Sequence, residues 1–143
     1  MPAIRHSIVI QAPAQKILEL VSSAAGLRRW WSADVSENEV VGTVDLGFFN
    51  RSTIYALQAL GKTTARMEWR CVTGNEWKNT RLIFETAAAK DATLLRFTHA
   101  DWKEETDYFI ACTTTWGGLM FRLKAEAEGK GTGPLFTAEA MAY

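Results

Sequence analysis

The chain has 143 residues, of which 48% are hydrophobic, and its 16 basic residues balance 16 acidic ones. This length fits one domain with a single buried core, and the balanced charge provides no field that would attract nucleic acid or an anionic membrane. No apolar run is long enough to cross a bilayer and no leader precedes the first strand, so we expect a cytoplasmic protein without stable membrane insertion.

The N-terminal part predicts one strand and two short helices. Residues 4–11 (IRHSIVIQ) alternate inward and outward side chains, as a strand does. A helix is expected over residues 13–22, because the proline that opens it suits a first helical turn. A second, shorter helix is predicted around residues 24–28, directly before the pair Trp30-Trp31.

The middle of the chain is interpreted as consecutive strands separated by polar turns. The alternation is clearest over residues 64–72, where Met67 and Trp69 face one side and Arg66 and Glu68 the other. The predicted strands span residues 40–44, 46–49, 53–60, 64–72, 80–87 and 93–100.

The C-terminal part predicts one long helix over residues 104–129. Its apolar residues recur at the spacing of a single helix face, with Trp116 near the middle. The pair Gly117-Gly118 costs roughly 1 kcal/mol per glycine in mid-helix, which indicates either a bend or a close approach of a neighbour. Residues 130–143 are interpreted as a tail, with a short terminal helix as one alternative.

This order of elements defines an α+β fold. Runs of consecutive strands require an antiparallel sheet of about six or seven strands, and the long helix is the element able to cover its apolar face. We therefore expect a single domain over residues 1–129. A strongly curved sheet wrapped around one helix leaves space near its open end, which is a natural place for a ligand cavity.

Several segments carry a resemblance to a known family. They are Ala12-Pro13 with the helix QKILELV, Leu27 to Trp31, Thr93 to His99, and Trp116 with Leu119 to Leu123 before Glu128-Gly129. Over residues 4–129 the chain resembles the SRPBCC superfamily, which includes START lipid-transfer domains, birch-pollen-allergen-like proteins and polyketide cyclases. Within it, the chain is similar to the branch of the activator of the heat-shock-protein-90 ATPase. The resemblance implies the helix-grip fold, and its motifs specify a fold better than a reaction.

The two histidines are the first candidates for chemistry. Antiparallel pairing of the first and last strands would make His6 and His99 neighbours, with Asp101 close by. Such a pair could act in general acid–base catalysis, whereas the simpler interpretation is that each ring forms a hydrogen bond to a backbone group or to water. A third ligand at metal spacing is missing, and Cys71 and Cys112 are too isolated for a zinc site, so we predict neither a metal nor a cofactor.

The inward-facing aromatic residues are the second set of candidates. Together they favour a pocket for a hydrophobic or aromatic small molecule, although large aromatics also fill ordinary cores. We expect Tyr55 and His99 to set ligand orientation. The predicted ligand-binding residues are Trp31, Tyr55, Met67, Trp69, Phe84, Phe97, His99, Trp116 and Met120.

Two other functions stay open at this point, as does the question whether the protein is an enzyme. One is a cyclase or dehydratase of the polyketide type, in which His99, Tyr55 or His6 would transfer protons. The other is regulation of a chaperone ATPase through protein–protein contact, which the resemblance implies. A homodimer is plausible because an antiparallel sheet leaves an edge strand exposed.

Overall fold

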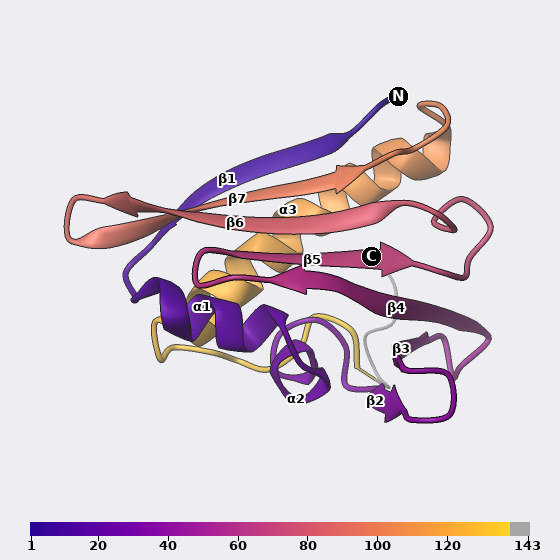
Figure 1. Cartoon of the computed structure of the whole chain (residues 1–143), viewed down its shortest axis with the longest axis horizontal. Coiled ribbons are helices and arrows are strands. Elements are labelled where there is room, and N and C mark those ends of the chain that lie inside the picture. The colour runs from indigo at the N-terminus through magenta and orange to yellow at the C-terminus, as the bar shows by residue number, and fades with distance from the viewer. Residues whose placement is uncertain (138–143) are drawn as a thin grey trace.

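The computed structural model describes residues 1–137 and shows a curved sheet with a long helix along one face (Figure 1). The strands are β1 (Ile4–Ile10), β2 (Val35–Asn38), β3 (Thr43–Phe48), β4 (Thr53–Lys62), β5 (Arg66–Cys71), β6 (Arg81–Ala89) and β7 (Ala92–Ala100). The helices are α1 (Ala14–Val21), α2 (Ala24–Arg28) and α3 (Asp107–Ala127).

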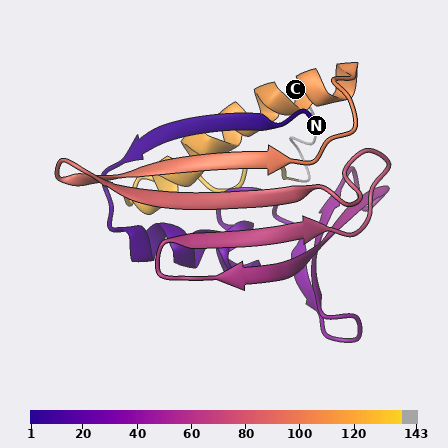
Figure 2. The ribbon, with the colours of Figure 1, turned by 45° about the horizontal axis from the view of Figure 1, so that its top comes forward.

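The seven strands form one antiparallel sheet in the order β1-β7-β6-β5-β4-β3-β2. The first strand therefore lies beside the last one, with Ile4 opposite His99. Figures 1 and 2 show α3 running behind the sheet, while α1 and α2 lie beside one end of it. The predicted α+β helix-grip fold is confirmed.

The periodic patterns in the sequence correspond to the buried faces of the elements. In β5 the alternating residues Met67, Trp69 and Cys71 are buried, as the sequence predicts. The buried stripe of α3 follows the predicted spacing and consists of Phe109, Cys112, Trp116, Leu119, Met120, Leu123 and Ala127.

Two buried tryptophans fix α1 to the rest of the core. The indole N–H of Trp30 donates to the carbonyl of Leu20, and that of Trp69 donates to the carbonyl of Val21, each at 2.8 Å. The last carbonyls of a helix have no partner within it, so these bonds satisfy groups that burial would otherwise leave unpaired.

The C-terminal half of α3 covers the free edge of β1. Lys124 Nζ donates to the carbonyl of Val9 at 2.6 Å, and Glu128 Oε2 accepts from the backbone N–H of Gln11 at 2.8 Å. These bonds occupy edge groups that would otherwise invite pairing with another chain.

Three predicted boundaries are wrong. Residues 40–44 and 46–49 do not form two strands, because β3 runs without a break from Thr43 to Phe48, and the preceding strand lies earlier, at Val35–Asn38. Val40 looks like a strand residue but is 94% exposed in the turn between β2 and β3. The long helix starts at Asp107 rather than residue 104, because Thr106 caps it by accepting from the N–H of Phe109.

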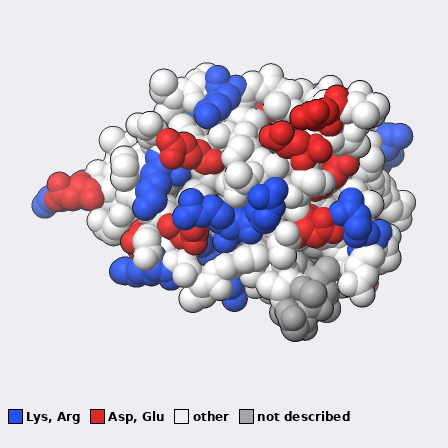
Figure 3. Space-filling view, turned by 90° about the horizontal axis from the view of Figure 1, so that it is seen from below, with Lys and Arg blue, Asp and Glu red and all other residues white. Residues whose placement is uncertain are grey.

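The surface agrees with the balanced composition on the face that Figure 3 shows. There, groups of Lys and Arg side chains alternate with groups of Asp and Glu, and neither sign covers the whole face. No helix within residues 1–137 is long and apolar enough to span a membrane.

Candidate functional site

A cavity of about 460 Å³ opens at the end of the sheet where α3 begins. Its walls come from the β3–β4 hairpin, the loop before β6, the first half of α3 and the segment after α3. The lining residues are Trp31, Phe48, Phe49, Thr53, Tyr55, Asn75, Glu76, Trp77, Tyr108, Ala111, Cys112, Thr115, Trp116, Leu119 and Phe136.

Stacked aromatic rings form one wall of this cavity. The rings of Tyr55 and Trp77 lie 4.2 Å apart and nearly parallel, at 5°. Trp77 in turn lies 6.0 Å from Trp116 at 17°, and Trp116 lies 4.9 Å from Trp31. Offset and tilted contacts of this kind are favourable, so the wall is a packed and largely rigid surface. Within residues 1–137, the buried indole N–H of Trp77 has no hydrogen-bond partner of normal geometry.

A pair of phenols provides polar groups near the start of α3. The hydroxyls of Tyr55 and Tyr108 share a hydrogen bond across the cavity. Burial raises the pKa of both phenols above the ordinary value, so both stay protonated at neutral pH. Burial also raises the pKa of the Cys112 thiol, and the neighbouring Trp77 and Tyr108 side chains only partly oppose that rise.

Glu76 connects the loop before β6 to the start of α3. The hydroxyl of Thr106 donates to Glu76 Oε1 at 2.5 Å and accepts from the backbone N–H of Phe109 at 3.1 Å. One side chain therefore caps α3 and ties it to a carboxylate that lines the cavity. This contact positions the first turn of α3 and, with it, Tyr108.

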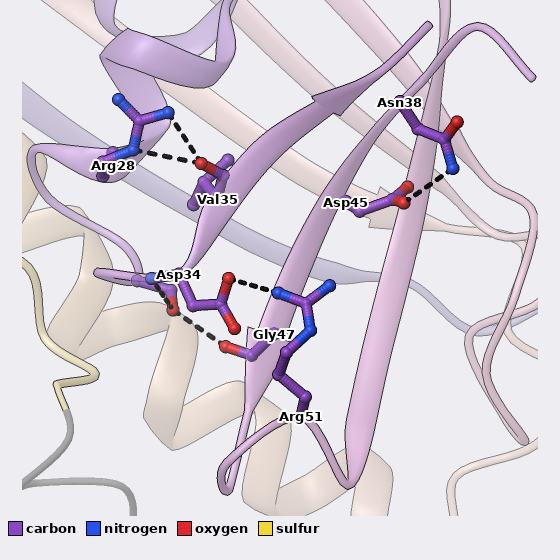
Figure 4. A network of polar contacts seen from close by, with 8 residues as sticks. Arg28, Asp34, Val35, Asn38, Asp45, Gly47 and Arg51 are labelled. Atoms are coloured by element: carbon purple, nitrogen blue, oxygen red, sulfur yellow. Dashed lines mark hydrogen bonds and ion pairs between the residues drawn. The ribbon is translucent and has the colours of Figure 1, made fainter. Parts of the chain in front are cut away.

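The rim beside Phe48 and Phe49 is held by a strained turn. Phe49, Asn50 and Arg51 all have φ between 54° and 68°, a region that residues other than glycine rarely adopt. Arg51 forms an ion pair with Asp34 at 2.5 Å (Figure 4). Such strain persists only where the surroundings fix it, and this ion pair is one such contact.

The same region explains a glycine in β3. A Cβ atom on Gly47 would lie 2.1 Å from Oδ2 of Asp34, so no other residue fits there without moving the carboxylate. Arg28 secures the adjacent strand through two bonds to the carbonyl of Val35, at 3.0 and 2.7 Å (Figure 4). Asn38 donates to Asp45 at 3.2 Å farther along the hairpin. The hairpin at the rim is therefore held by Arg28 and Asn38 as well as by the ion pair of Arg51.

The segment after α3 returns to the cavity. Phe136 forms an isolated parallel bridge with Ser32, and its N–H donates to the carbonyl of Trp31 at 3.0 Å. Its ring packs edge-on against Phe48, with centroids 5.1 Å apart. Part of the predicted tail thus contributes to the cavity wall, while the alternative of a terminal helix concerns residues 138–143 too, which lie outside the described residues.

The structure brings three of the nine predicted ligand-binding residues to the cavity. Trp31, Tyr55 and Trp116 line it. The other six lie in the core without lining it, and all are nearly or fully buried: Met67, Trp69, Phe84, Phe97, His99 and Met120. The inward orientation of a side chain therefore does not by itself tell whether the residue lines the cavity or belongs to the filled core.

The two histidines take up separate structural contacts. His99 is fully buried, accepts from the Trp116 indole at 3.1 Å through Nδ1, and bonds the Thr80 hydroxyl at 2.8 Å through Nε2. Burial lowers the pKa of His99 to about 3, so its ring is neutral at physiological pH. His6 instead bonds the backbone carbonyl of Thr113 at 3.2 Å. Asp101, expected beside them, pairs with Arg81 at 2.6 Å.

Sequence reasoning missed several lining residues. Trp77 and Tyr108 stand out, because each makes a central contact of the cavity, while Phe48, Glu76 and Phe136 complete the rim. Trp77 lies in a loop without periodicity, and Tyr108 follows an acidic stretch, so neither belongs to a pattern of inward-facing positions. The one available signal was the large number of tryptophans, of which the chain has six.

The sheet, the long helix and the cavity between them define a helix-grip protein of the SRPBCC superfamily. The sequence profile described as "Polyketide cyclase / dehydrase and lipid transport" matches residues 1–142, so the chain belongs to this family. A comparison with curated protein sequences gives no significant match.

Solved structures support the same assignment. The Aha1 dimer from Colwellia psychrerythraea is 28% identical, with a TM-score of 0.79 over 91% of this chain and 98% of that chain. CalU16 from Micromonospora echinospora is 16% identical, with a TM-score of 0.71 over 92% of this chain and 68% of that one. A START superfamily protein from Mycobacterium smegmatis is 14% identical, with a TM-score of 0.65 over 89% and 97%. The last two show the fold alone, and the first supports the predicted similarity to the ATPase-activator branch.

Proposed function

We propose that the protein binds a hydrophobic or aromatic small molecule in the cavity at the start of α3. The observation that carries this proposal is an open cavity of about 460 Å³ whose walls are mainly aromatic. Small-molecule sites usually have volumes of roughly 300–1,000 Å³, apolar walls and a few convergent polar groups. Here the tryptophans would supply contact area, and the Tyr55–Tyr108 pair would orient the ligand.

Two further features support a binding site over a merely incomplete core. The turn at Phe49 holds a strained backbone at the rim, and the buried N–H of Trp77 beside the cavity has no hydrogen-bond partner of normal geometry within residues 1–137, although it lies near the Cys112 thiol. Each costs free energy, about 1–3 kcal/mol for a poorly paired buried donor.

The first experiment is native mass spectrometry of freshly purified protein, followed by titration with 1-pyrenemethanol, an uncharged aromatic probe. We expect either a co-purifying small molecule or saturable binding of the probe, detected by energy transfer from tryptophan. Ala111→Trp should abolish binding, because Ala111 lines the cavity from an exposed position on α3.

Thr114→Trp is the matched control, because Thr114 is exposed on the same helix but does not line the cavity. It should bind as the unmodified protein does. The proposal fails if the protein is always free of ligand and does not bind the probe, or if Ala111→Trp binds it unchanged.

We also propose that the protein forms a homodimer through the outward face of α3. Residues 108–121 contain no charged side chain, although Ile110 is 58% and Phe121 68% exposed. These two positions share one helix face with Thr114 and Gly117. An antiparallel twofold pairing would place Ile110 of one copy against Phe121 of the other, which gives a self-complementary contact.

Gly117 adds support for this dimer. A Cβ atom there would meet only His6, at an ordinary distance of 3.7 Å, so packing among the described residues does not require a glycine. The similar Colwellia protein was solved as a dimer. Sedimentation should give a dimer mass that Phe121→Lys reduces to a monomer and that Val41→Lys, in an exposed turn, leaves intact. A monomeric unmodified protein would contradict this interface.

The similarity to Aha1 also favours a second candidate function, regulation of a chaperone ATPase by direct contact. Added protein should then increase ATP turnover by a purified chaperone of the heat-shock-protein-90 class. The Ala111→Trp variant separates the two functions, since a blocked cavity would leave stimulation unchanged if contact alone is responsible. A protein that binds the probe and never affects turnover would exclude this candidate.

A further inference from the structure

The cavity wall contains very little charge. Its described lining residues include no Lys, Arg or His, and Glu76 is the one carboxylate among them. Residues 138–143 (AEAMAY), outside the described range, contain no basic side chain in their sequence either. Nothing in this wall therefore offers a positive counter-charge to a bound anion.

The remaining titratable groups of the wall are neutral at physiological pH. Burial raises the pKa of Tyr55, of Tyr108 and of the Cys112 thiol above their ordinary values. Glu76 accepts a hydrogen bond from Thr106, which keeps its carboxylate in a defined position at the wall. A ligand in the cavity thus meets neutral aromatic, hydroxyl, thiol and amide groups and one negative charge.

The phenol pair offers one hydrogen-bond donor. Tyr55 and Tyr108 have two hydroxyl protons between them, and one of these protons makes the bond that joins the pair. The other takes no part in that bond and can donate to an acceptor on a ligand. The hydroxyl of Thr115 is already used, since it donates to the carbonyl of Ala111 at 3.3 Å.

We propose that the cavity selects uncharged planar molecules that carry an oxygen acceptor, that it also admits planar cations, and that it rejects carboxylates and other anions, free fatty acids included. This inference rests on the function proposed above. A planar skeleton matches the parallel rings of Tyr55 and Trp77, and the acceptor matches the free phenol proton. An anion would lose its hydration without a counter-charge and would be repelled by Glu76.

Three probes with one ring system test this selection: 1-pyrenemethanol, the 1-pyrenemethylammonium ion and pyrene-1-carboxylate. Each is titrated at neutral pH, with energy transfer from tryptophan as the signal. We expect the alcohol and the ammonium ion to bind, and the carboxylate to bind at least about tenfold more weakly, given the size of a like-charge interaction in a partly buried site.

Glu76→Gln tests the source of the selection. The amide keeps an acceptor for Thr106 but removes the charge, so affinity for the carboxylate should rise, affinity for the ammonium ion should fall, and that for the alcohol should stay the same. Glu37→Gln, on an exposed position of β2, is the matched control and should change none of the three. A urea titration of each variant verifies that it is folded.

The outcomes separate the two proposals. If all three probes bind equally, or the carboxylate binds best, the charge selection is overturned while the proposed binding function stands. An unchanged affinity ratio in Glu76→Gln also overturns it. If no probe binds to the unmodified protein, the proposed function itself fails.

Discussion

Gly74 controls the position of the Tyr55 ring, and its replacement by alanine is the sharpest test of how the cavity wall is built. Gly74 has φ of +102° in the loop between β5 and β6. A Cβ atom there would lie 2.7 and 2.9 Å from two ring carbons of Tyr55 and 3.2 Å from Cβ of Trp77. Because Tyr55 is stacked on Trp77, its ring has to move toward the cavity to make room.

The expected loss of stability has two parts. A residue with a Cβ atom held at positive φ costs about 1–2 kcal/mol. Forcing an extra carbon into a packed cluster costs roughly another 1–3 kcal/mol. We therefore expect the free energy of unfolding of Gly74→Ala to fall by about 2–5 kcal/mol, a large part of the 5–15 kcal/mol typical of a domain.

Urea denaturation measures this loss, and two other glycines separate its parts. Gly129 has φ of +78°, and a Cβ atom there would meet no other described residue within 4 Å, so Gly129→Ala should lose only the backbone part, about 1–2 kcal/mol. Gly61 has open space and no positive φ, so Gly61→Ala should be neutral or stabilising by up to about 1 kcal/mol. Folded Gly74→Ala should also bind 1-pyrenemethanol more weakly. Equal losses for Gly74→Ala and Gly129→Ala would refute the argument that Tyr55 is fixed by contact.

Three further predictions concern the framework of the site. Burial lowers the pKa of His99 from 6.5 to about 3, so the unfolded chain takes up this proton first, and the free energy of unfolding should fall as the pH drops from 6.5 toward 3. Urea titrations at several pH values should show that His99→Gln removes this contribution, whereas His6→Gln keeps it. Thr106→Ala should cost about 1–2 kcal/mol by loss of the α3 cap, and Thr106→Ser should recover most of it in the same titration. Trp69→Phe should lower the free energy of unfolding by about 1–3 kcal/mol, because it leaves the buried carbonyl of Val21 unpaired. A thermal melt measures this loss, and an unchanged melting temperature would show that water replaces the lost indole donor.

The fold could be predicted because its signals are local and repeated. Every second residue of β5 points the same way, so the burial of Met67 and Trp69 follows from the alternation itself. The buried stripe of α3 follows from its spacing in the same manner. Boundaries are harder to predict where two signals compete. The acids at 104 and 105 suit a helix start, but the hydroxyl of Thr106 is the group that accepts from the first free N–H groups.

The candidate site could be predicted only in part, because alternation gives the face of a strand but not the depth of the space above it. Trp69 and Phe97 face inward as predicted, yet elements that fill the space cover them: Trp69 bonds the end of α1, and Phe97 packs 4.1 Å from Trp116. Trp77 belongs to a loop, where no period applies, and its place at the centre of the wall depends on long-range packing. Cavity wall and core thus contain the same residue types, and only the tertiary packing determines which of these residues line the cavity.

The two ends of α3 are held in different ways, and this difference explains where the cavity opens. At its C-terminal end, Lys124 and Glu128 bond the edge of β1 directly, and α1 packs against the helix. At its N-terminal end, the contacts reach across the cavity through side chains, from Thr106 to Glu76 and from Tyr108 to Tyr55. A ligand that accepts a hydrogen bond from the second phenol proton contacts the same pair of residues. Binding therefore involves the residue pair that joins the first turns of α3 to the sheet, so we expect occupancy of the cavity and the position of those turns to be coupled.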